Sequence, residues 1–401
     1  MRLPKALFQR FTSYIARNAG EARIKNENML GNILLAVVGT IVGIGIALGA
    51  FVAFIGDIRL LPTYLYDDAV VFRSGNGDIL FWQSEYSTPL EDPFEILSVH
   101  RLQLDEIGFR LPARVADDYT VVTLGDSYTE GANVARPWAD VFASETGLAT
   151  RNLGFRGYGT QHYEYIWETY GQAENPDIVI LGFFGANDIA TGGLDLSPPF
   201  PTPRESRAQD APAIPVTTRA DIDVPIIYPI TLENGEPLTF LTDYISWMNA
   251  DENTLLQSVN YNVIRENLTT IYDTADDDTC MVFVYLPSKP EVYFPYVQPQ
   301  FYDAILQDQK HVLLNNDGTL HIVEDFEITL DKVLNNRPST GNVMMNLADD
   351  IGYETLNLID AFNSAAAEGE MLFYAYDTHP NQAGQTLAGK TIAEFVENTC
   401  S

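Results

Sequence analysis

Positive charge is the scarcest property of this sequence. Lysine and arginine together number 23 and only six of these are lysine, whereas aspartate and glutamate number 55, with 31 aspartates among them. The formal net charge is −32 at pH 7. Nucleic acid is itself a polyanion, so such a chain repels it rather than attracting it. The composition therefore argues against a nucleic-acid partner and is typical of a solvated acidic surface.

Cysteine is also scarce, since only Cys280 and Cys400 are present. Two cysteines are too few for a disulfide framework, and neither has the Cys-x-x-Cys or Cys/His spacing of a zinc site. An oxidising compartment permits one bridge between them, but the sequence does not imply it. A phosphate-binding loop and a Gly-x-Gly-x-x-Gly turn after a strand are absent as well. We therefore expect neither a metal nor a cofactor.

Charge is missing altogether from one long stretch near the start of the sequence. Ile33–Ile55 is an uncharged run of 23 residues, long enough to cross the ~30 Å hydrocarbon layer as a helix. Six basic and two acidic residues precede it, so the positive-inside rule predicts a cytoplasmic N-terminus and an extracytoplasmic remainder. The run exceeds the roughly 7–15 residues of a signal-peptide core, which favours an uncleaved signal anchor over a cleaved leader.

The rest of the sequence has ample material for a core, because 46% of all residues are hydrophobic and tyrosine and phenylalanine number 21 each. We expect a basic cytoplasmic segment at 1–32, the anchor at 33–55, an N-terminal extension at 56–116 and a catalytic domain at 117–400. An insertion is expected at about 190–250. Within the extension, Leu61–Ala116 has the pattern of strands in short pieces.

Apolar runs alternate with helical periodicity in the expected catalytic domain, as in an α/β fold with a parallel sheet. The expected strands are Thr120–Leu124, Arg151–Leu153, Ile178–Phe184, Met281–Leu286 and Leu356–Ile359. The expected helices lie at about Trp138–Thr146, Tyr163–Gln172, Leu255–Thr274, Val343–Asp350 and Gln382–Asn398. Two stretches without either period, the proline-rich Ser197–Pro237 and Glu291–Arg337, are expected to be irregular. The proline-rich stretch either lines the site or is a passive surface excursion.

A serine lies where the first expected strand ends. Val121–Leu124 runs directly into Gly125-Asp126-Ser127. Open α/β sheets commonly carry catalytic groups at this edge. A serine hydroxyl needs a neighbouring base to act as a nucleophile, and a lone serine in such a turn more often caps a helix. Because Tyr128-Thr129 follows, the Gly-x-Ser-x-Gly elbow is absent.

Two turns that contain glycine and asparagine follow the next two expected strands. Asn152-Leu153-Gly154-Phe155-Arg156-Gly157 comes first, and Gly185-Ala186-Asn187-Asp188 follows Ile178–Phe184. A glycine N–H or an asparagine amide at this edge can donate to a developing oxyanion. Both residue types are also ordinary in turns. Gly154, Gly157 and Gly159 all compete for the main-chain role.

One histidine has an acidic neighbour in a suitable place. Asp377-Thr378-His379 lies on the expected loop before the last helix. An aspartate this close can bind one ring nitrogen and leave the other facing a serine. The other four histidines have no comparable companion: His100, His162, His311 and His321.

These four blocks, in this order, resemble the SGNH (GDSL-type) hydrolase family over roughly Asp105 to Glu397. The resemblance implies a three-layer, flavodoxin-like fold with a mostly parallel sheet of about five strands. It implies that Ser127 is the nucleophile and His379 the general base, with Asp377 orienting the histidine. It assigns the oxyanion hole to the Ser127 N–H, the Gly157 N–H and the Asn187 side chain. The family's usual spacing is Asp-x-x-His, whereas here one residue intervenes, as in SGNH-like polysaccharide O-acetyltransferases.

The resulting expectation is a membrane-anchored, extracytoplasmic serine esterase that hydrolyses carboxylic esters, with small-molecule or glycan esters as substrates, through an acyl-enzyme. A first alternative is an O-acyltransferase that modifies a cell-envelope polysaccharide by the same mechanism. A second alternative is a non-catalytic binding or envelope-assembly protein that keeps the fold. The acyl group, the acceptor and the oligomeric state are not encoded in these motifs.

Overall fold

The computed structural model describes residues 58–59, 64–66, 72–74, 77–88, 91–186, 188–191, 194–195, 202–203, 227–241, 244–245, 248–307, 311–314, 320–323, 328–375 and 377–400. The predicted anchor, Ile33–Ile55, lies outside these ranges. Within them, no helix combines the length and the apolar character needed to cross a membrane.

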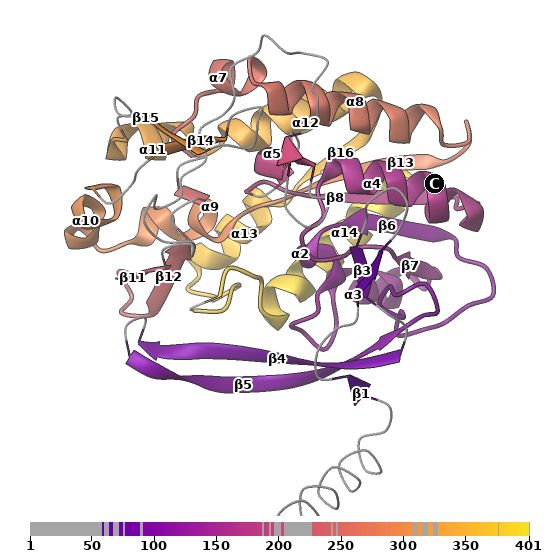
Figure 1. Cartoon of the computed structure of the whole chain (residues 1–401), viewed down its shortest axis with the longest axis horizontal. Helices are drawn as coiled ribbons and strands as arrows, with labels where there is room; N and C mark the ends of the chain where they lie inside the picture. Colours follow the sequence, from indigo (N-terminus) through magenta and orange to yellow (C-terminus); the bar gives the residue numbers. More distant parts are fainter. Residues whose placement is uncertain are drawn as a thin grey trace, which may run out of the picture. The chain divides into compact units, whose positions relative to one another are not determined.

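A five-stranded parallel sheet organises the part of the chain that follows the N-terminal extension (Figure 1). Its spatial order is β7-β6-β8-β13-β16, and every neighbouring pair is parallel. Numbered by chain order the strands read 2-1-3-4-5, the order of flavodoxin-like sheets. The sheet grows outward from β6 in both directions, so the topological switch point lies between β6 and β8. The prediction of an α/β fold with a parallel sheet is confirmed. The strands are β6 (Val121–Gly125), β7 (Thr150–Asn152), β8 (Ile178–Phe184), β13 (Cys280–Leu286) and β16 (Glu354–Asn357).

Helices cover both faces of this sheet, because alternate strand residues point to opposite sides and both sides are apolar. Val121 and Ile180 belong to a core shared with α3 (Trp138–Thr146) and α14 (Gln382–Thr399). On the other face, Val122 and Leu181 pack in a second core beneath three helices. These are α4 (Thr160–Ile166), α8 (Val259–Asp273) and α12 (Ser339–Ile351).

Shorter elements occupy the connections. The helices and helical turns are α2 (Ser127–Glu130), η1 (Trp167–Gly171), η2 (Gln172–Glu174), α5 (Asp188–Thr191), α7 (Glu252–Leu256), α9 (Lys289–Tyr293), η3 (Phe294–Tyr296), η4 (Pro299–Phe301), α10 (Tyr302–Gln307), α11 (Leu330–Asn336) and α13 (Ile359–Ala367). The strands outside the parallel sheet are β1 (Ile58–Arg59), β2 (Tyr64–Tyr66), β3 (Phe72–Ser74), β4 (Gly77–Thr88), β5 (Glu91–Leu104), β9 (Leu194–Asp195), β10 (Thr202–Pro203), β11 (Ile227–Thr231), β12 (Pro237–Leu241), β14 (His311–Leu314) and β15 (Leu320–Val323).

The N-terminal extension differs from the expected short pieces. β4 and β5, of 12 and 14 residues, form a long antiparallel ribbon. Register shifts at Gln83/Ser84 and Tyr86/Thr88 interrupt the pairing of the two strands. Such shifts also interrupt the alternation of polar and apolar residues from which long strands are predicted. At the end of β5, Leu102 and Leu104 pack with Ala132, which lies in the loop after α2.

The region expected to be irregular, Glu291–Arg337, contains several regular elements, from α9 to α11. They escaped prediction because each is too short to show a period. α9 is set by its cap, since Ser288 and Glu291 form a capping box. The last sheet strand also ends earlier than expected. The Asn357 side chain accepts from the Ile359 N–H, and Ile359 starts α13, a helix that the sequence pattern did not reveal.

A disulfide joins Cys280, the first residue of β13, to Cys400, which follows α14. The bridge therefore connects a central strand to the last helix, at the edge of the sheet where the strands begin. The residue pattern alone had left this bridge undecided.

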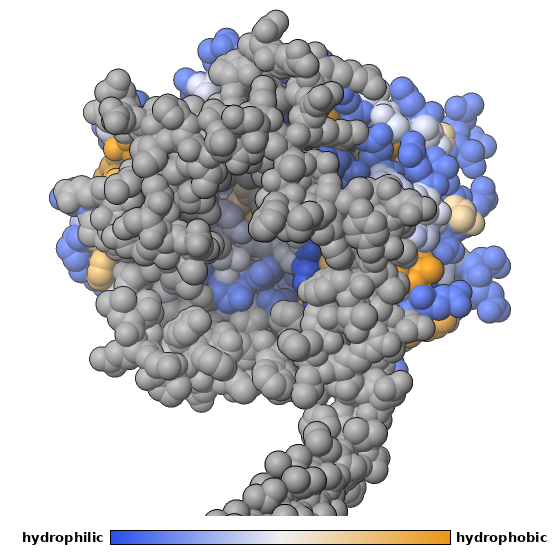
Figure 2. All heavy atoms as spheres, in the orientation of Figure 1, coloured by the Kyte–Doolittle hydropathy of each residue, from blue (hydrophilic) through white to orange (hydrophobic). Residues whose placement is uncertain are grey.

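On the face that Figure 2 shows, the described residues are mainly hydrophilic. Among residues whose side chains are described, the exposed large hydrophobic ones are Val115, Leu256 and Leu334. They are isolated in the sequence, as expected of ordinary surface apolar residues.

Candidate active site

The turn after β6 presents Ser127 at the first position of α2. Asp126 caps this helix, because its Oδ1 accepts from the Tyr128 N–H at 2.9 Å. Ser127 is therefore not the helix cap, the role that a lone serine would most often have there. Its hydroxyl is left available for other contacts, and no hydrogen bond involves its N–H within the described residues.

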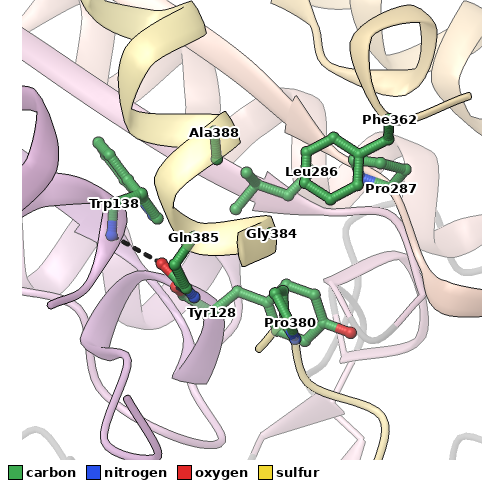
Figure 3. A pocket seen from close by; sticks show the side chains of 9 residues that line it. All are labelled: Tyr128, Trp138, Leu286, Pro287, Phe362, Pro380, Gly384, Gln385 and Ala388. Carbon is green, nitrogen blue, oxygen red and sulfur yellow. Dashed lines mark hydrogen bonds between the residues drawn. The ribbon is translucent and has the colours of Figure 1, made fainter. Parts of the chain in front are cut away.

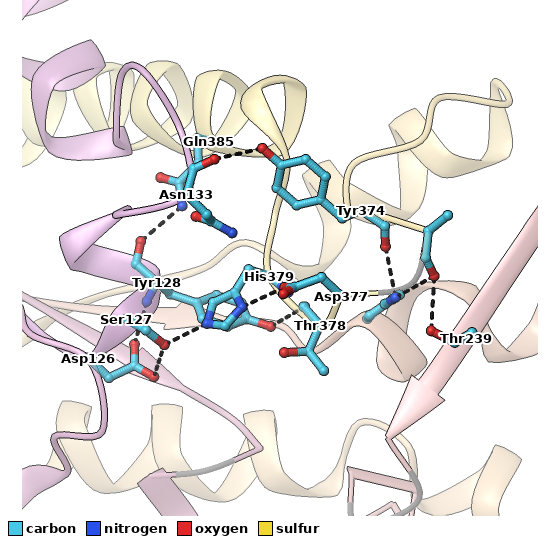
Figure 4. Close-up of polar contacts among 12 residues, drawn as sticks. Asp126, Ser127, Tyr128, Asn133, Thr239, Tyr374, Asp377, Thr378, His379 and Gln385 are labelled. Carbon is cyan, nitrogen blue, oxygen red and sulfur yellow. Dashed lines mark hydrogen bonds and ion pairs between the residues drawn. The ribbon is translucent and has the colours of Figure 1, made fainter. Parts of the chain in front are cut away.

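His379 connects Ser127 to Asp377 (Figure 4). Its Nε2 lies 2.9 Å from the Ser127 Oγ, although 252 residues separate the two in the sequence. Its Nδ1 lies 2.6 Å from the Asp377 Oδ1. With the proton on Nδ1, the imidazole donates to Asp377 and accepts from the serine hydroxyl, as a general base requires.

The short Asp-x-His spacing suits this contact. The Asp377 Oδ1 also accepts from the His379 backbone N–H at 2.7 Å, so the aspartate side chain folds back over a tight turn. Asn381 holds the chain on both sides of this turn. Its side-chain oxygen caps α14, and its side-chain amide donates to the carbonyls of Met371 and Phe373. One intervening residue is therefore enough for a carboxylate to reach the imidazole.

The charges in this group are coupled. Burial lowers the pKa of His379, but the charge and hydrogen bond of Asp377, assisted by Asp126 and Glu130, outweigh it and raise the pKa above its ordinary value. Burial also raises the pKa of Asp377, and the His379 charge and hydrogen bonds reverse this and hold it well below the usual range. Asp377 is thus ionised and favours an imidazolium beside it.

Tyr128 fixes the histidine loop against α2. Its hydroxyl donates to the Thr378 carbonyl at 2.7 Å, and its ring stacks on Phe184 at a centroid distance of 3.7 Å. Gln385 of α14 donates to the Tyr128 carbonyl at 3.0 Å. In the sequence, nothing about Tyr128 or its neighbours signals this contact across 250 residues.

The pocket beside Tyr128 has no room for a substrate (Figure 3). Its volume is about 10 Å³, close to the minimum for one water molecule. Its lining residues come from several elements, including α2, α3, the end of β13, α13 and α14. They are Tyr128, Trp138, Leu286, Pro287, Phe362, Pro380, Gly384, Gln385 and Ala388. This side of Tyr128 is therefore packed core, and an ester must approach Ser127 from another direction.

The structure distinguishes the three glycines that compete for the oxyanion role. The Gly154 N–H donates to the Asn152 side chain at 2.9 Å, and the Gly159 N–H donates to His162 at 3.1 Å. Gly157 is exposed, and its N–H has no hydrogen-bond partner among the described residues. Its φ of +79° is a conformation that favours glycine.

Asn187, the other predicted oxyanion donor, lies outside the described residues. Its neighbours are anchored on both sides. A Cβ on Gly185 would lie 1.9 Å from the Tyr285 hydroxyl, so this position requires glycine because of close packing. Asp188 is fully buried and accepts from the Phe184 N–H and from the Tyr163 hydroxyl, each at 2.8 Å. Burial, together with the charge of Asp126, raises the pKa of Asp188 well above its usual range.

Buried arginine contacts hold the loop that follows α2. Arg110, 8% exposed, donates to the carbonyls of Gly131 at 2.5 Å and Ala135 at 2.9 Å, with longer contacts to Glu130 and Val134. The Glu130 carboxylate pairs with the Arg156 guanidinium and accepts from the Arg156 N–H at 3.1 Å. The extension and the second sequence block therefore both bind the end of α2 and the loop that follows it. Sequence reasoning missed Arg110 because its partners are carbonyls, which any residue supplies.

A metal ion would need several ligating side chains close together. Among the residues that the structure describes, no group of three or more His, Cys, Asp or Glu side chains is arranged to hold one. The three side chains that meet at His379 supply a hydroxyl, an imidazole and a carboxylate.

Residues 123–313 match the model of the GDSL-like lipase/acylhydrolase family. The chain contains a GDSL-like hydrolase domain. This match confirms the resemblance drawn from the four blocks, and the protein is an enzyme of the SGNH ester hydrolase type. The matched part of the hydrolase includes Ser127 and Gly157, whereas Asp377 and His379 lie beyond it. No curated protein sequence matches the hydrolase.

Several solved structures resemble the hydrolase at low sequence identity. A catalytic mutant of an acetylxylan esterase from Geobacillus stearothermophilus is 12% identical, with a TM-score of 0.36 over 70% of this chain and 95% of that one. A phospholipase A1 from Streptomyces albidoflavus is also 12% identical, with a TM-score of 0.36 over 70% and 99%. A protein from Lactobacillus plantarum is 16% identical, with a TM-score of 0.32 over 71% and 99%.

Proposed function

We propose that the protein is a membrane-anchored, extracytoplasmic serine esterase that hydrolyses carboxylic esters through an acyl-enzyme. One observation carries the catalytic part of the proposal: the contact from the Ser127 Oγ through both ring nitrogens of His379 to the Asp377 carboxylate. Three side chains in this order make a serine nucleophilic at neutral pH.

In the first half-reaction the Ser127 Oγ attacks the ester carbonyl carbon while the His379 Nε2 takes the hydroxyl proton. Asp377 stabilises the imidazolium that forms. The tetrahedral intermediate collapses when the C–O bond to the alcohol breaks, and His379 returns the proton to the departing alkoxide oxygen. The products of this step are the free alcohol and an acyl ester on Ser127.

In the second half-reaction a water molecule takes the place of the alcohol. His379 removes a proton from the water as its oxygen attacks the acyl carbon, and the second tetrahedral intermediate releases the Ser127 oxygen. The same proton passes from His379 to that oxygen. The carboxylic acid leaves, and the enzyme returns to its starting state.

The negative charge of each intermediate needs donors that are in place beforehand. We assign this role to the N–H groups of Ser127 and Gly157 and to the Asn187 side chain. The N–H groups of Ser127 and Gly157 are not engaged by other described residues, while those of Gly154 and Gly159 are.

Two features support the proposed location. The uncharged run Ile33–Ile55 follows a basic segment, the arrangement of a signal anchor with a cytoplasmic N-terminus. The Cys280–Cys400 disulfide is of the kind that forms and persists in oxidising compartments. Protease treatment of intact cells or spheroplasts tests this: an extracytoplasmic domain is digested and a cytoplasmic one is protected.

Carbohydrate esters are the substrate class that we propose for an enzyme facing the cell envelope. The Asp-Thr-His block, shared with SGNH-like polysaccharide O-acetyltransferases, keeps transfer of the acyl group to a sugar hydroxyl as the second candidate. Purified enzyme with an acetylated oligosaccharide and a free sugar acceptor separates the two. Transfer that exceeds hydrolysis would establish the transferase.

Hydrolysis of p-nitrophenyl acetate by the full-length protein in detergent tests the catalytic proposal. We expect Ser127→Ala and His379→Ala each to lose at least about 10³-fold in kcat. Ser364→Ala, which removes an exposed hydroxyl on α13, is the matched control and should retain wild-type activity. A folded wild type with no turnover and no labelling of Ser127 by a fluorophosphonate would favour a non-catalytic binding protein.

A further inference from the structure

Lys289 is a buried ammonium group close to the active-site loop. It is the first residue of α9 and is only 1% exposed. The capping box of Ser288 and Glu291 fixes the start of this helix, and Pro290 suits its first turn. Local capping therefore sets the backbone from which the lysine side chain extends.

The ammonium binds the chain just before Asp377. The Lys289 Nζ donates to the Tyr374 carbonyl at 2.8 Å and to the Ala375 carbonyl at 3.0 Å. The Tyr374 N–H donates in turn to the His379 carbonyl at 3.1 Å, which closes the loop that carries both catalytic side chains. Lys289 thus holds one end of this loop.

A buried ammonium that only donates hydrogen bonds to two carbonyls costs more free energy than a neutral donor would. Burial of a neutral donor such as the Thr239 hydroxyl, which binds the same Ala375 carbonyl at 3.1 Å, costs far less free energy than burial of an ammonium. The charge also acts electrostatically on Asp377. Burial raises the pKa of Asp377, and the His379 contacts and then the Lys289 charge lower it. Lys289 therefore contributes to keeping the orienting carboxylate ionised.

We propose that Lys289 is a positioning residue for the reaction: it holds residues 374–375 so that the Asp377 carboxylate stays on the His379 Nδ1, and it compensates the charge of that carboxylate. The proposal rests on the proposed function, because it acts through Asp377.

A double-mutant cycle in the full-length enzyme tests this role. Lys289→Met keeps the length of the side chain and removes the charge and the donors. We expect kcat/KM for p-nitrophenyl acetate to fall about tenfold or more, mainly through kcat, because small displacements of a catalytic group cost up to about 10²-fold. In the Asp377→Asn background the same change should cost less than about threefold. An equal loss in both backgrounds would overturn the proposal.

Three controls make the outcome decisive. Lys390→Met removes an exposed lysine on α14 and should leave kcat/KM unchanged. If Lys289→Met fails to fold, Lys289→Arg and Lys289→Gln replace it, and the charged variant should keep the higher kcat; equal kcat values would contradict the proposal. Activity of the wild type and of Ser127→Ala identifies failure of the esterase function itself, separately from failure of the Lys289 role.

Discussion

Asp377 uses one oxygen for two contacts with the same residue. Its Oδ1 receives the His379 backbone N–H and faces the ring Nδ1, so the conformation of the turn and the orientation of the imidazole are set together. His379 can act as a base only when its Nε2 carries no proton. Because Asp377 raises the pKa of His379, replacement of Asp377 should change that pKa measurably.

Replacement of Asp377 by asparagine should move the pH profile towards acid. His379 acts as a base only when neutral, and Asp377 raises its pKa, so the wild-type kcat/KM should rise with pH through a midpoint above the ordinary histidine value of about 6.5. Without the carboxylate, the largest contribution that raises the pKa of His379 is lost, which shifts the midpoint below that of the wild type. We also expect kcat to fall about 10²- to 10⁴-fold.

The measurement is kcat/KM against pH from about 4.5 to 9. Asp360→Asn, on the exposed side of α13, changes the net charge equally and should leave the midpoint in place. A midpoint that stays at the wild-type pH in Asp377→Asn would remove Asp377 from its assigned role.

At the scale of elements, the helix that begins at Ser127, α2, and the loop after it are held by parts of the chain that are distant in the sequence. Arg110, from the segment between β5 and β6, binds the carbonyls that follow α2, and Tyr128 binds the loop before α14. The extension is therefore part of the support for Ser127. The contribution of the extension can be measured as a change in the free energy of unfolding.

Substitution of Arg110 by methionine should lower the free energy of unfolding by about 3 kcal/mol. The guanidinium is buried, and its loss leaves several carbonyls without their donor. Urea denaturation followed by fluorescence measures this change. Arg114→Met is the matched control: Arg114 is exposed and makes one contact of 3.4 Å, so its loss should cost less than about 0.5 kcal/mol. Similar losses in both variants would show that the extension does not support the turn.

A second contact between elements has a smaller expected effect. Tyr128→Phe removes the hydrogen bond to the Thr378 carbonyl while the ring stays stacked on Phe184. The expected cost is about 1 kcal/mol, the usual net value of one such bond. Thermal unfolding should show a lower Tm, and the KM for p-nitrophenyl acetate should stay near the wild-type value. Unchanged stability would mean that water replaces the hydroxyl without loss.

Across the whole molecule, the disulfide and the site lie at opposite edges of the same sheet. Cys280 pairs with Ile178 at the start of β8, whereas Gly125, just before Ser127, pairs with Gly182 near its end. Stability and catalysis should therefore respond separately to loss of the bridge.

The double variant Cys280→Ser/Cys400→Ser should be less stable by about 2–5 kcal/mol and nearly as active as the wild type. The bridge closes a loop with a sequence separation of 120 residues, and long loops restrict the unfolded chain most. The midpoint of urea unfolding measures the first effect, and kcat/KM below the transition measures the second. Dithiothreitol should destabilise the wild type and leave the double variant unaffected.

Local patterns of neighbouring residues determined much of this molecule by themselves. The strand Ile178–Phe184 and the helix Trp138–Thr146 have the predicted bounds, because a continuous apolar run and a clear period are properties of neighbouring residues. The first and last of the four blocks also identified the residues that the fold brings together at His379. Asn187 and the membrane anchor remain predictions of the sequence.

Only the tertiary structure decided which residues support that chemistry. The contacts of Ser127 with His379 and of Tyr128 with Thr378 each span 250 residues or more, and Lys289 and Arg110 bind backbone carbonyls that carry no side-chain signature. The structure likewise shows that the N–H groups of Gly154 and Gly159 are bonded to side chains, whereas that of Gly157 has no partner among the described residues. Such contacts are set by how the chain packs around the sheet, and packing joins residues whose sequence neighbours hold no information about one another.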